Sequence, residues 1–306
     1  MTTAAPARIV ALDAARGAAI VAMVAFHLTW DLGNFGYIDR DFPYSPSVKL
    51  FGHAIAIAFL FIVGVSLVVA RARGAGPGAF WRRFFVIAGA AGLVSLGTYI
   101  AFPQAFVFFG ILHCIALASL LATPLLPLPW SAALLASLVA ALAPMFFASP
   151  VFNTPWLNWI GLSTFEPLTN DYRPIVPWCA AVFGGVAAAK LWAARGWGVV
   201  GGNLEAGPLA WLGRHSLALY LIHQPLLFGL FAALVFVGAT PSDRSSGGFV
   251  GACVAQCEAS VGGKSVCREA CACMAERAAS EELPTEAKAR ARLLDEIASD
   301  CLAKEY

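Results

Sequence analysis

The stretch RIVALDAARGAAIVAMVAFHLTWDL, residues 8–32, combines the length of a membrane-spanning helix with four ionisable side chains. A spanning helix needs about 20 mostly apolar residues, and a charged group at its centre costs about 2.5–3.5 kcal/mol on insertion scales. At 100° per residue, Arg16 and His27 lie about 20° apart, and Asp13 and Asp31 fall within roughly 60° of the same direction. One side of this helix is therefore polar and is expected to face protein or water rather than lipid.

The rest of the chain is also strongly apolar. Of its 306 residues, 59% are hydrophobic and only 12% are charged, and the mean hydropathy is +0.74, whereas soluble domains are about a quarter charged. Together with the first stretch, six further apolar segments predict about seven spans: 50–70, 84–102, 106–123, 131–148, 175–193 and 209–238. We therefore expect an all-α protein, a polytopic helical bundle in the lipid bilayer.

The composition changes after residue 240. Residues 1–240 hold 12 Lys and Arg against 7 Asp and Glu, whereas residues 241–306 hold 8 against 11. Neither part is basic enough to indicate nucleic-acid binding. The sequence SDRSSGG is typical of a flexible linker, so we expect a membrane domain over 1–240 and a soluble tail over 241–306. A role of the tail in docking a partner protein is one alternative.

The arginines of the short loops predict the orientation of the chain in the membrane. Residues 71–83 hold four arginines and the 190–214 connection holds Lys190, Arg195 and Arg214, and such loops are typically cytoplasmic. Seven spans then place the N-terminus inside the cell. They place the loop 149–174 and the tail outside, for a protein of the plasma membrane, and the tail would be periplasmic or otherwise extracytoplasmic.

His27 and Asp31 are four residues apart, so their side chains can meet on one helix face. A carboxylate that holds one imidazole nitrogen raises the basicity of the other, as in a general base. The alternative is a His–Asp pair that only joins helices. Asp13 and Arg16, three residues apart, can likewise form a salt bridge with a purely structural role. Arg16 lies about 16 Å from His27 along the helix, about half a bilayer.

Other polar residues are also candidates for binding a ligand. The loop arginines, together with Arg16, suit phosphate groups of a ligand, although loop arginines often only set topology. These arginines are Arg71, Arg73, Arg82 and Arg83. Further side chains are candidates for substrate binding or for lining a polar cavity: Asp13, His53, His113, His215, Tyr220, His223 and Gln224. A lone intramembrane histidine such as His113 is usually an interhelical hydrogen bonder, and the cluster in the last span is also readable as a kinked packing interface.

Six of the eight cysteines lie in the tail. Cys253 and Cys271 are each nine residues from Gly262, and Cys257 and Cys267 are each five residues from it. A helical hairpin turning at 262–263 would pair these cysteines symmetrically and leave Cys273 to pair with Cys301, as suits an oxidising compartment. The alternative is a four-cysteine metal site, but C-x3-C is a less usual zinc spacing than C-x2-C. We expect disulfides and no metal.

The first helix resembles that of the transmembrane acyltransferase superfamily, most closely the bacterial relatives of heparan-α-glucosaminide N-acetyltransferase. Arg16 and His27 match its pattern of an Arg, ten residues and a His. Weaker matches are FLFIVGVSL at 59–67, GILHCIAL at 110–117 and RPIVPW at 173–178, and WLGRHSLALYLIHQPLL at 211–227 is more specific.

The resemblance implies transfer of an acetyl or other short acyl group from a cytoplasmic acyl-CoA, such as acetyl-CoA, to the oxygen or nitrogen of an acceptor across the membrane. His27 would be catalytic, Arg16 and the loop arginines would bind the phosphates of the acyl-CoA, and a sugar or glycan acceptor would arrive from outside. The lysosomal relatives have more helices and a lumenal domain, both missing here. The alternative function is a transporter or channel that uses the polar side of the first helix, although no inverted repeat of hydropathy supports it.

Overall fold

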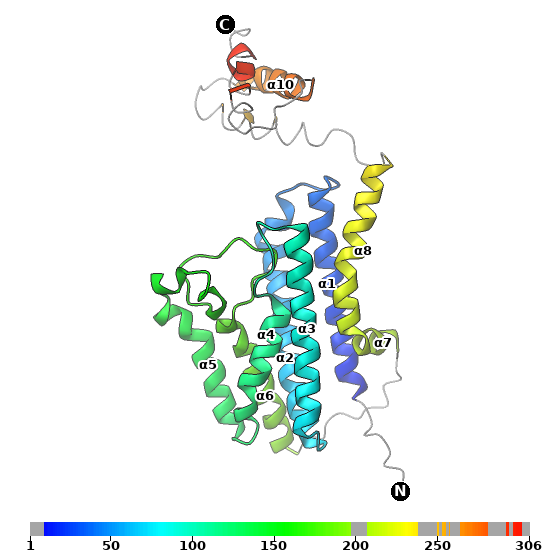
Figure 1. Ribbon diagram of the computed structural model, residues 1–306, viewed down its shortest axis with the longest axis vertical. Coiled ribbons are helices and arrows are strands. Elements are labelled where there is room, and N and C mark those ends of the chain that lie inside the picture. The colour runs from blue at the N-terminus through cyan, green and yellow to red at the C-terminus, as the bar shows by residue number, and fades with distance from the viewer. Residues whose placement is uncertain are drawn as a thin grey trace. The chain divides into compact units, whose positions relative to one another are not determined.

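The computed structural model describes residues 9–196, 207–237, 250, 253–254, 257, 264–280, 292–293 and 296–301 (Figure 1). Among these residues the regular elements are helices, with one isolated β-bridge between Phe109 and Tyr172. The chain forms two compact units, one of residues 1–29 and 44–229 and the other of residues 30–43 and 230–306. The main helices are α1 Val10–Asn34, α2 Pro46–Ala72, α3 Pro77–Ala101, α4 Ile111–Ala122, α5 Trp130–Phe147, α6 Ile175–Ala194, α7 Pro208–Arg214, α8 Ser216–Phe236 and α10 Lys264–Ser280.

Six of the helices in the described part of the chain are long and apolar enough to cross a membrane: α1, α2, α3, α5, α6 and α8. This confirms the membrane helical bundle. The predicted span over 106–123 differs, because it is helical only from Ile111 and is therefore shorter than a spanning helix. The residues before it, 102–110, are not helical and instead bond to a second irregular segment, as Asn170 N–H donates to the Ala105 carbonyl at 2.9 Å.

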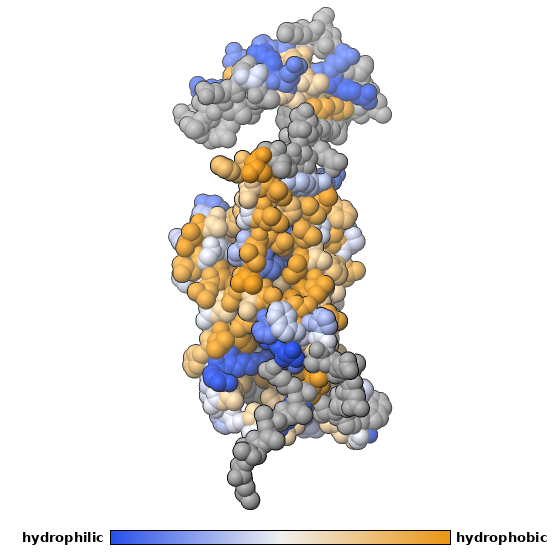
Figure 2. All heavy atoms as spheres, turned by 90° about the vertical axis from the view of Figure 1, so that its right-hand side faces the viewer, coloured by the Kyte–Doolittle hydropathy of each residue, from blue (hydrophilic) through white to orange (hydrophobic). Residues whose placement is uncertain are grey.

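The short helix α4 lies in the core of the first unit. Eight of its 12 residues are buried, whereas α3 and α5 each bury two small residues. The outer faces of α3 and α5 instead expose large apolar side chains, such as Leu96 at 57% and Leu135 at 63%. Such exposure suits helices that face lipid tails, and Figure 2 shows the same hydrophobic character on the side of α1 and α8.

Glycines bring α2 and α6 into close contact. A side chain on Gly64 would overlap the Val182 carbonyl, and one on Gly185 would overlap the Phe61 carbonyl. Without a hydrophobic drive between helices in lipid, small residues at the interface allow close van der Waals packing. These two positions therefore set how closely α2 and α6 approach.

The last predicted span, 209–238, is two helices rather than one. The chain breaks at His215, and Figure 1 shows α7 turned sharply away from the axis of α8. Helix α7 packs against the start of α1, where a side chain on Gly17 would overlap the Leu209 carbonyl and one on Gly213 would overlap the Asp13 carbonyl. The break follows from this close contact, because a straight continuation of α8 would not bring both Leu209 and Gly213 against α1.

The second unit contains the cysteine tail, and its six cysteines form the three predicted pairs. The Cα atoms of Cys253 and Cys271 are 5.8 Å apart, those of Cys257 and Cys267 5.6 Å, and those of Cys273 and Cys301 5.9 Å. The disulfide prediction is confirmed, and the alternative of a metal site on these cysteines is wrong because their thiols are consumed. The predicted turn at 262–263 lies outside the described residues.

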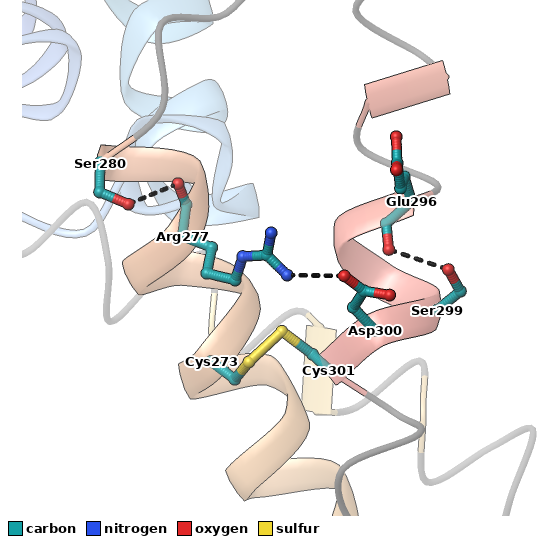
Figure 3. The surroundings of a disulfide bond; sticks show 7 residues. All are labelled: Cys273, Arg277, Ser280, Glu296, Ser299, Asp300 and Cys301. Atoms are coloured by element: carbon teal, nitrogen blue, oxygen red, sulfur yellow. Dashed lines mark hydrogen bonds and ion pairs between the residues drawn. A yellow bond between two sulfur atoms is a disulfide. The ribbon is translucent and has the colours of Figure 1, made fainter.

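An ion pair lies close to the last disulfide: Arg277 Nη1 on α10 is 3.0 Å from Asp300 Oδ2 (Figure 3). Cys301 and Ile297 are both buried, each with an exposed fraction of 1%. An exposed ion pair contributes little to stability. The disulfide and the buried Ile297 therefore hold the C-terminal helical turns against α10.

Candidate functional site

Two histidines from opposite ends of the sequence meet in the first unit. The rings of His27 on α1 and His223 on α8 have centroids 4.8 Å apart. His223 Nδ1 lies 2.7 Å from the Tyr220 carbonyl, and because a carbonyl only accepts, Nδ1 carries the proton. His223 Nε2 therefore presents its lone pair, and this atom is buried without a hydrogen-bond partner among the described residues. The pair thus offers an imidazole nitrogen that can take up a proton.

Asp31 follows His27 by one helical turn on α1 and is 3% exposed. Its predicted role in orienting His27 stays a prediction. Tyr220 and Gln224 are half-buried neighbours of His223 on α8. The Tyr220 ring lies 5.8 Å from the His223 ring, so the predicted grouping on the last span holds for the part of the chain within α8.

Arg173 brings a positive charge to the same centre. It lies just before α6, and its guanidinium carbon is 4.7 Å from the ring centroid of Trp178, which is a cation–π contact. Its charge acts through space on His27, His53 and Tyr220. Arg173 is the first residue of the RPIVPW match, but it was not among the candidate site residues predicted from the sequence. The available signal was a single arginine at the start of an apolar span.

The position of Arg173 depends on the start of α4. Its backbone N–H donates to the Phe109 carbonyl at 3.1 Å, and its Nε lies 3.8 Å from Asp171 Oδ1. The other oxygen, Asp171 Oδ2, accepts the backbone N–H of Ile111 at 2.8 Å. One carboxylate therefore caps α4 and contacts the arginine. A side chain on Gly110 would collide with it.

The ionisation of this segment follows from its burial. Burial raises the pKa of Asp171, although Arg173 and the Ile111 N–H act in the opposite direction. Burial, followed by the charge of Glu166, raises the pKa of Tyr172 to about 12. Tyr172 is therefore a neutral phenol near pH 7, and it donates to the Asn158 carbonyl at 2.6 Å.

Both ring nitrogens of His113 lie within hydrogen-bonding distance of other groups. Its Nδ1 accepts the Gly110 N–H at 3.2 Å, so the proton is on Nε2, which lies 3.3 Å from Ser95 Oγ. Ser95 in turn donates to the Val107 carbonyl at 2.6 Å. His113 Nε2 thus joins α4 to α3, as expected of an interhelical hydrogen bonder, and its Nδ1 bonds the backbone at the start of its own helix.

The other two histidines lie outside the His27–His223 pair. His53 is exposed on α2, with its ring 5.4 Å from that of Trp178. His215 is exposed at the break between α7 and α8, with its ring 4.5 Å from Trp211. Because the predicted last span is broken at His215, this residue does not lie on one continuous helix with His223.

The predicted phosphate-binding arginines separate into two groups. Arg16 Nη1 pairs with Asp13 at 2.9 Å, and its Nη2 donates to Ser66 on α2. Arg83 on α3 is half-buried, lies within electrostatic range of Arg16 and makes no ion pair among the described residues. The remaining three, Arg71, Arg73 and Arg82, are exposed. Arg16 and Arg83 therefore bring two positive charges of α1 and α3 near each other.

A comparison with protein families identifies the family of residues 8–225. The sequence model described as "Heparan-alpha-glucosaminide N-acetyltransferase, catalytic" matches residues 8–225 of the 306, which include Arg16, His27, Arg173 and His223. No curated protein and no solved structure shows significant similarity to the chain. The match covers most of the chain and confirms the resemblance seen in the first helix, so the chain belongs to the heparan-alpha-glucosaminide N-acetyltransferase catalytic-domain family.

Proposed function

We propose that this protein is a membrane acyltransferase that moves an acetyl or other short acyl group from a cytoplasmic acyl-CoA to a sugar or glycan on the outer side. Membership of an acetyltransferase family supports the reaction class. The observation that carries the proposal is the His27–His223 pair, with its buried, unpartnered Nε2 on His223. Such a lone pair, shielded from water, suits a general base.

Three residues take part in the proposed reaction: His27, Arg173 and His223. The acceptor hydroxyl or amine gives its proton to His27 as its oxygen or nitrogen bonds to the thioester carbonyl carbon. Arg173 stabilises the negative charge that develops on the carbonyl oxygen. The carbon–sulfur bond then breaks, and the histidine returns the proton to the departing thiolate, which leaves as free coenzyme A. His223 shares or relays this proton because its Nε2 faces no other partner.

The donor's phosphates fit the positive charge between α1 and α3. Arg83 makes no ion pair there among the described residues, and Arg16 lies within electrostatic range of it. Arginine is the preferred partner of phosphate oxygens because its guanidinium binds them in a bidentate manner. The distance of about 16 Å from Arg16 to His27 along α1 is suited to an extended pantetheine arm.

The disulfides support an outer location for the tail. Three disulfides in 49 residues, Cys253 to Cys301, are typical of an oxidising compartment. A membrane-impermeant thiol reagent applied to intact cells should label the tail only after reduction. Labelling without reductant, or none after it, would contradict this sidedness.

The decisive experiment compares His27→Ala with Thr29→Val. Thr29 lies two residues further along α1 and donates to the Ala25 carbonyl of its own helix, so its substitution controls for changes in the helix. With labelled acetyl-CoA and an amino sugar, we expect His27→Ala to insert normally and to lose about 10²–10⁴-fold in transfer. Full transfer by His27→Ala would refute the mechanism. Passage of the sugar through vesicles without acylation would favour a transporter.

A further inference from the structure

A groove between α1 and α8 opens on the side of the first unit. Its volume is about 350 Å³, and its walls include Ile20, Val21 and Val24 of α1 and Ile222, His223 and Leu226 of α8. This volume is near the lower end of ligand sites, which are about 300–1,000 Å³. Apart from His223, the lining is aliphatic, so the groove suits a hydrocarbon chain and offers no counter-charge to an anion.

The groove faces the hydrocarbon of the bilayer. It lies along two helices long and apolar enough to span a membrane, and the residues at its edges are exposed, with Val21 at 50%, Ile222 at 48% and Leu226 at 65%. Figure 2, which looks onto this side, shows a largely hydrophobic surface with a small hydrophilic area visible within it. An occupant therefore enters from the lipid phase without crossing water.

The inner end of the groove reaches the reaction centre. His223 is its polar lining residue, and the buried Nε2 of His223 has no partner among the described residues. The His27 ring lies 4.8 Å from the His223 ring. A chain held in this groove would therefore place the polar group at its end beside both histidines.

The charges distinguish the two substrates that could supply such a chain. The donor carries phosphates, and the arginines that suit them lie between α1 and α3, next to α2 rather than in the groove. The groove has no cationic lining residue when His223 is neutral. Its chemistry therefore matches the second substrate.

We propose that the acceptor is carried on a membrane lipid whose hydrocarbon chain lies in the α1–α8 groove. Its hydroxyl or amine then reaches His27 and His223 from the side of the bundle. This inference rests on the proposed transferase function and specifies the acceptor class as lipid-linked.

The test uses two probes that share one sugar, methyl glucoside and dodecyl glucoside, with the full-length protein in phosphatidylcholine vesicles and labelled acetyl-CoA. Val24→Phe fills the groove, and Ile222→Phe fills it from the other wall. Leu138→Phe is the matched control, because Leu138 is 52% exposed on α5. Partition of the long probe into the bilayer is the same for every variant, so a difference between variants reports on the groove.

We expect each groove variant to lower kcat/KM for dodecyl glucoside by about tenfold and to leave methyl glucoside within about twofold, while Leu138→Phe changes neither. A dodecyl glucoside with a photoactivatable group at its chain end should label peptides of α1 and α8, and less so in Val24→Phe. Equal loss for both sugars, or equal labelling in the variant, would overturn the proposal. A changed preference among acyl-CoA chain lengths would assign the groove to the donor instead.

The photolabelling distinguishes a failure of the lipid-linked acceptor proposal from a failure of the proposed transferase function. If the unmodified protein acetylates neither sugar, the transferase activity toward glucosides fails, while groove-specific labelling still supports chain binding. If the protein acetylates both sugars equally and the label does not reach α1 or α8, the function stands and the lipid-linked acceptor is refuted.

Discussion

Asp171→Ala tests whether the carboxylate that contacts Arg173 also caps α4 and stabilises the fold. Asp171 Oδ2 accepts the N–H of Ile111 at 2.8 Å, and Ile111 is only 9% exposed. Loss of a side-chain acceptor at a helix start costs about 1 kcal/mol, and a buried N–H left without a partner costs about 1–3 kcal/mol. We therefore expect the free energy of unfolding to fall by about 2 kcal/mol.

Thermal unfolding of the purified protein in detergent would measure this change. A loss of about 2 kcal/mol corresponds to a decrease in Tm of roughly 3 °C for a chain of 306 residues. Asp171→Asn is the matched control because its amide oxygen can still accept the Ile111 N–H, and its decrease should be less than half as large. Equal decreases for both variants, or none for Asp171→Ala, would show that the cap does not stabilise α4.

The pH dependence of the same measurement tests the charge. Burial raises the pKa of Asp171 above its ordinary value of 3.8, so the folded protein holds this proton more tightly than the unfolded chain does. The contribution of this group to stability is therefore greatest below pH 3.8 and falls as the pH rises through the folded-state pKa. Asp171→Asn has no such proton, so its Tm relative to the unmodified protein should improve over that range. A parallel pH dependence of the two proteins would contradict the raised pKa.

Two further predictions concern the charge at the site and the tail. Arg173→Met should lower kcat/KM for acyl transfer by about 10²-fold and Arg173→Lys by less, because the lysine keeps the charge but not the planar contact with Trp178; equal activity of both variants and the unmodified protein would exclude a role in the reaction. Opening the Cys273–Cys301 disulfide by serine substitution should destabilise the tail by about 3.5 kcal/mol, since the pair closes a separation of 28 residues, and protease resistance of the tail in the full-length protein checks this value.

Hydropathy predicted most of the bundle because a spanning helix needs only length and apolar composition. It gave α4 the wrong length, since segment 106–123 is apolar throughout. Helix α4 begins at Ile111 because Asp171, some 60 residues away, binds the N–H of that residue. The break between α7 and α8 likewise depends on the contact of Gly213 with α1. Tertiary contacts of this kind leave no periodic pattern in the sequence.

The cysteine pairs and the first histidine were easier to predict than Arg173. Symmetry about Gly262 restricts the tail cysteines to one simple hairpin pairing, and an ionisable His27 within an apolar stretch is conspicuous in the sequence itself. Arg173 has no such context, because an arginine that starts a span also resembles a residue at the membrane surface. Its role depends on Trp178 and on a segment that folds back against 102–110, which only the structure reveals.

The short length of α4 explains how a charged group reaches the histidine pair. A full-length helix at this position would fill the path now taken by residues 102–110 with apolar side chains. Irregular backbone among spanning helices is tolerated only where its polar groups are satisfied within the protein. Here the Phe109–Tyr172 bridge and the bonds of Ala105 and Phe109 to the facing segment satisfy them. The two irregular segments therefore stabilise each other, and in doing so they hold Asp171 at the start of α4 and Arg173 over the ring of Trp178.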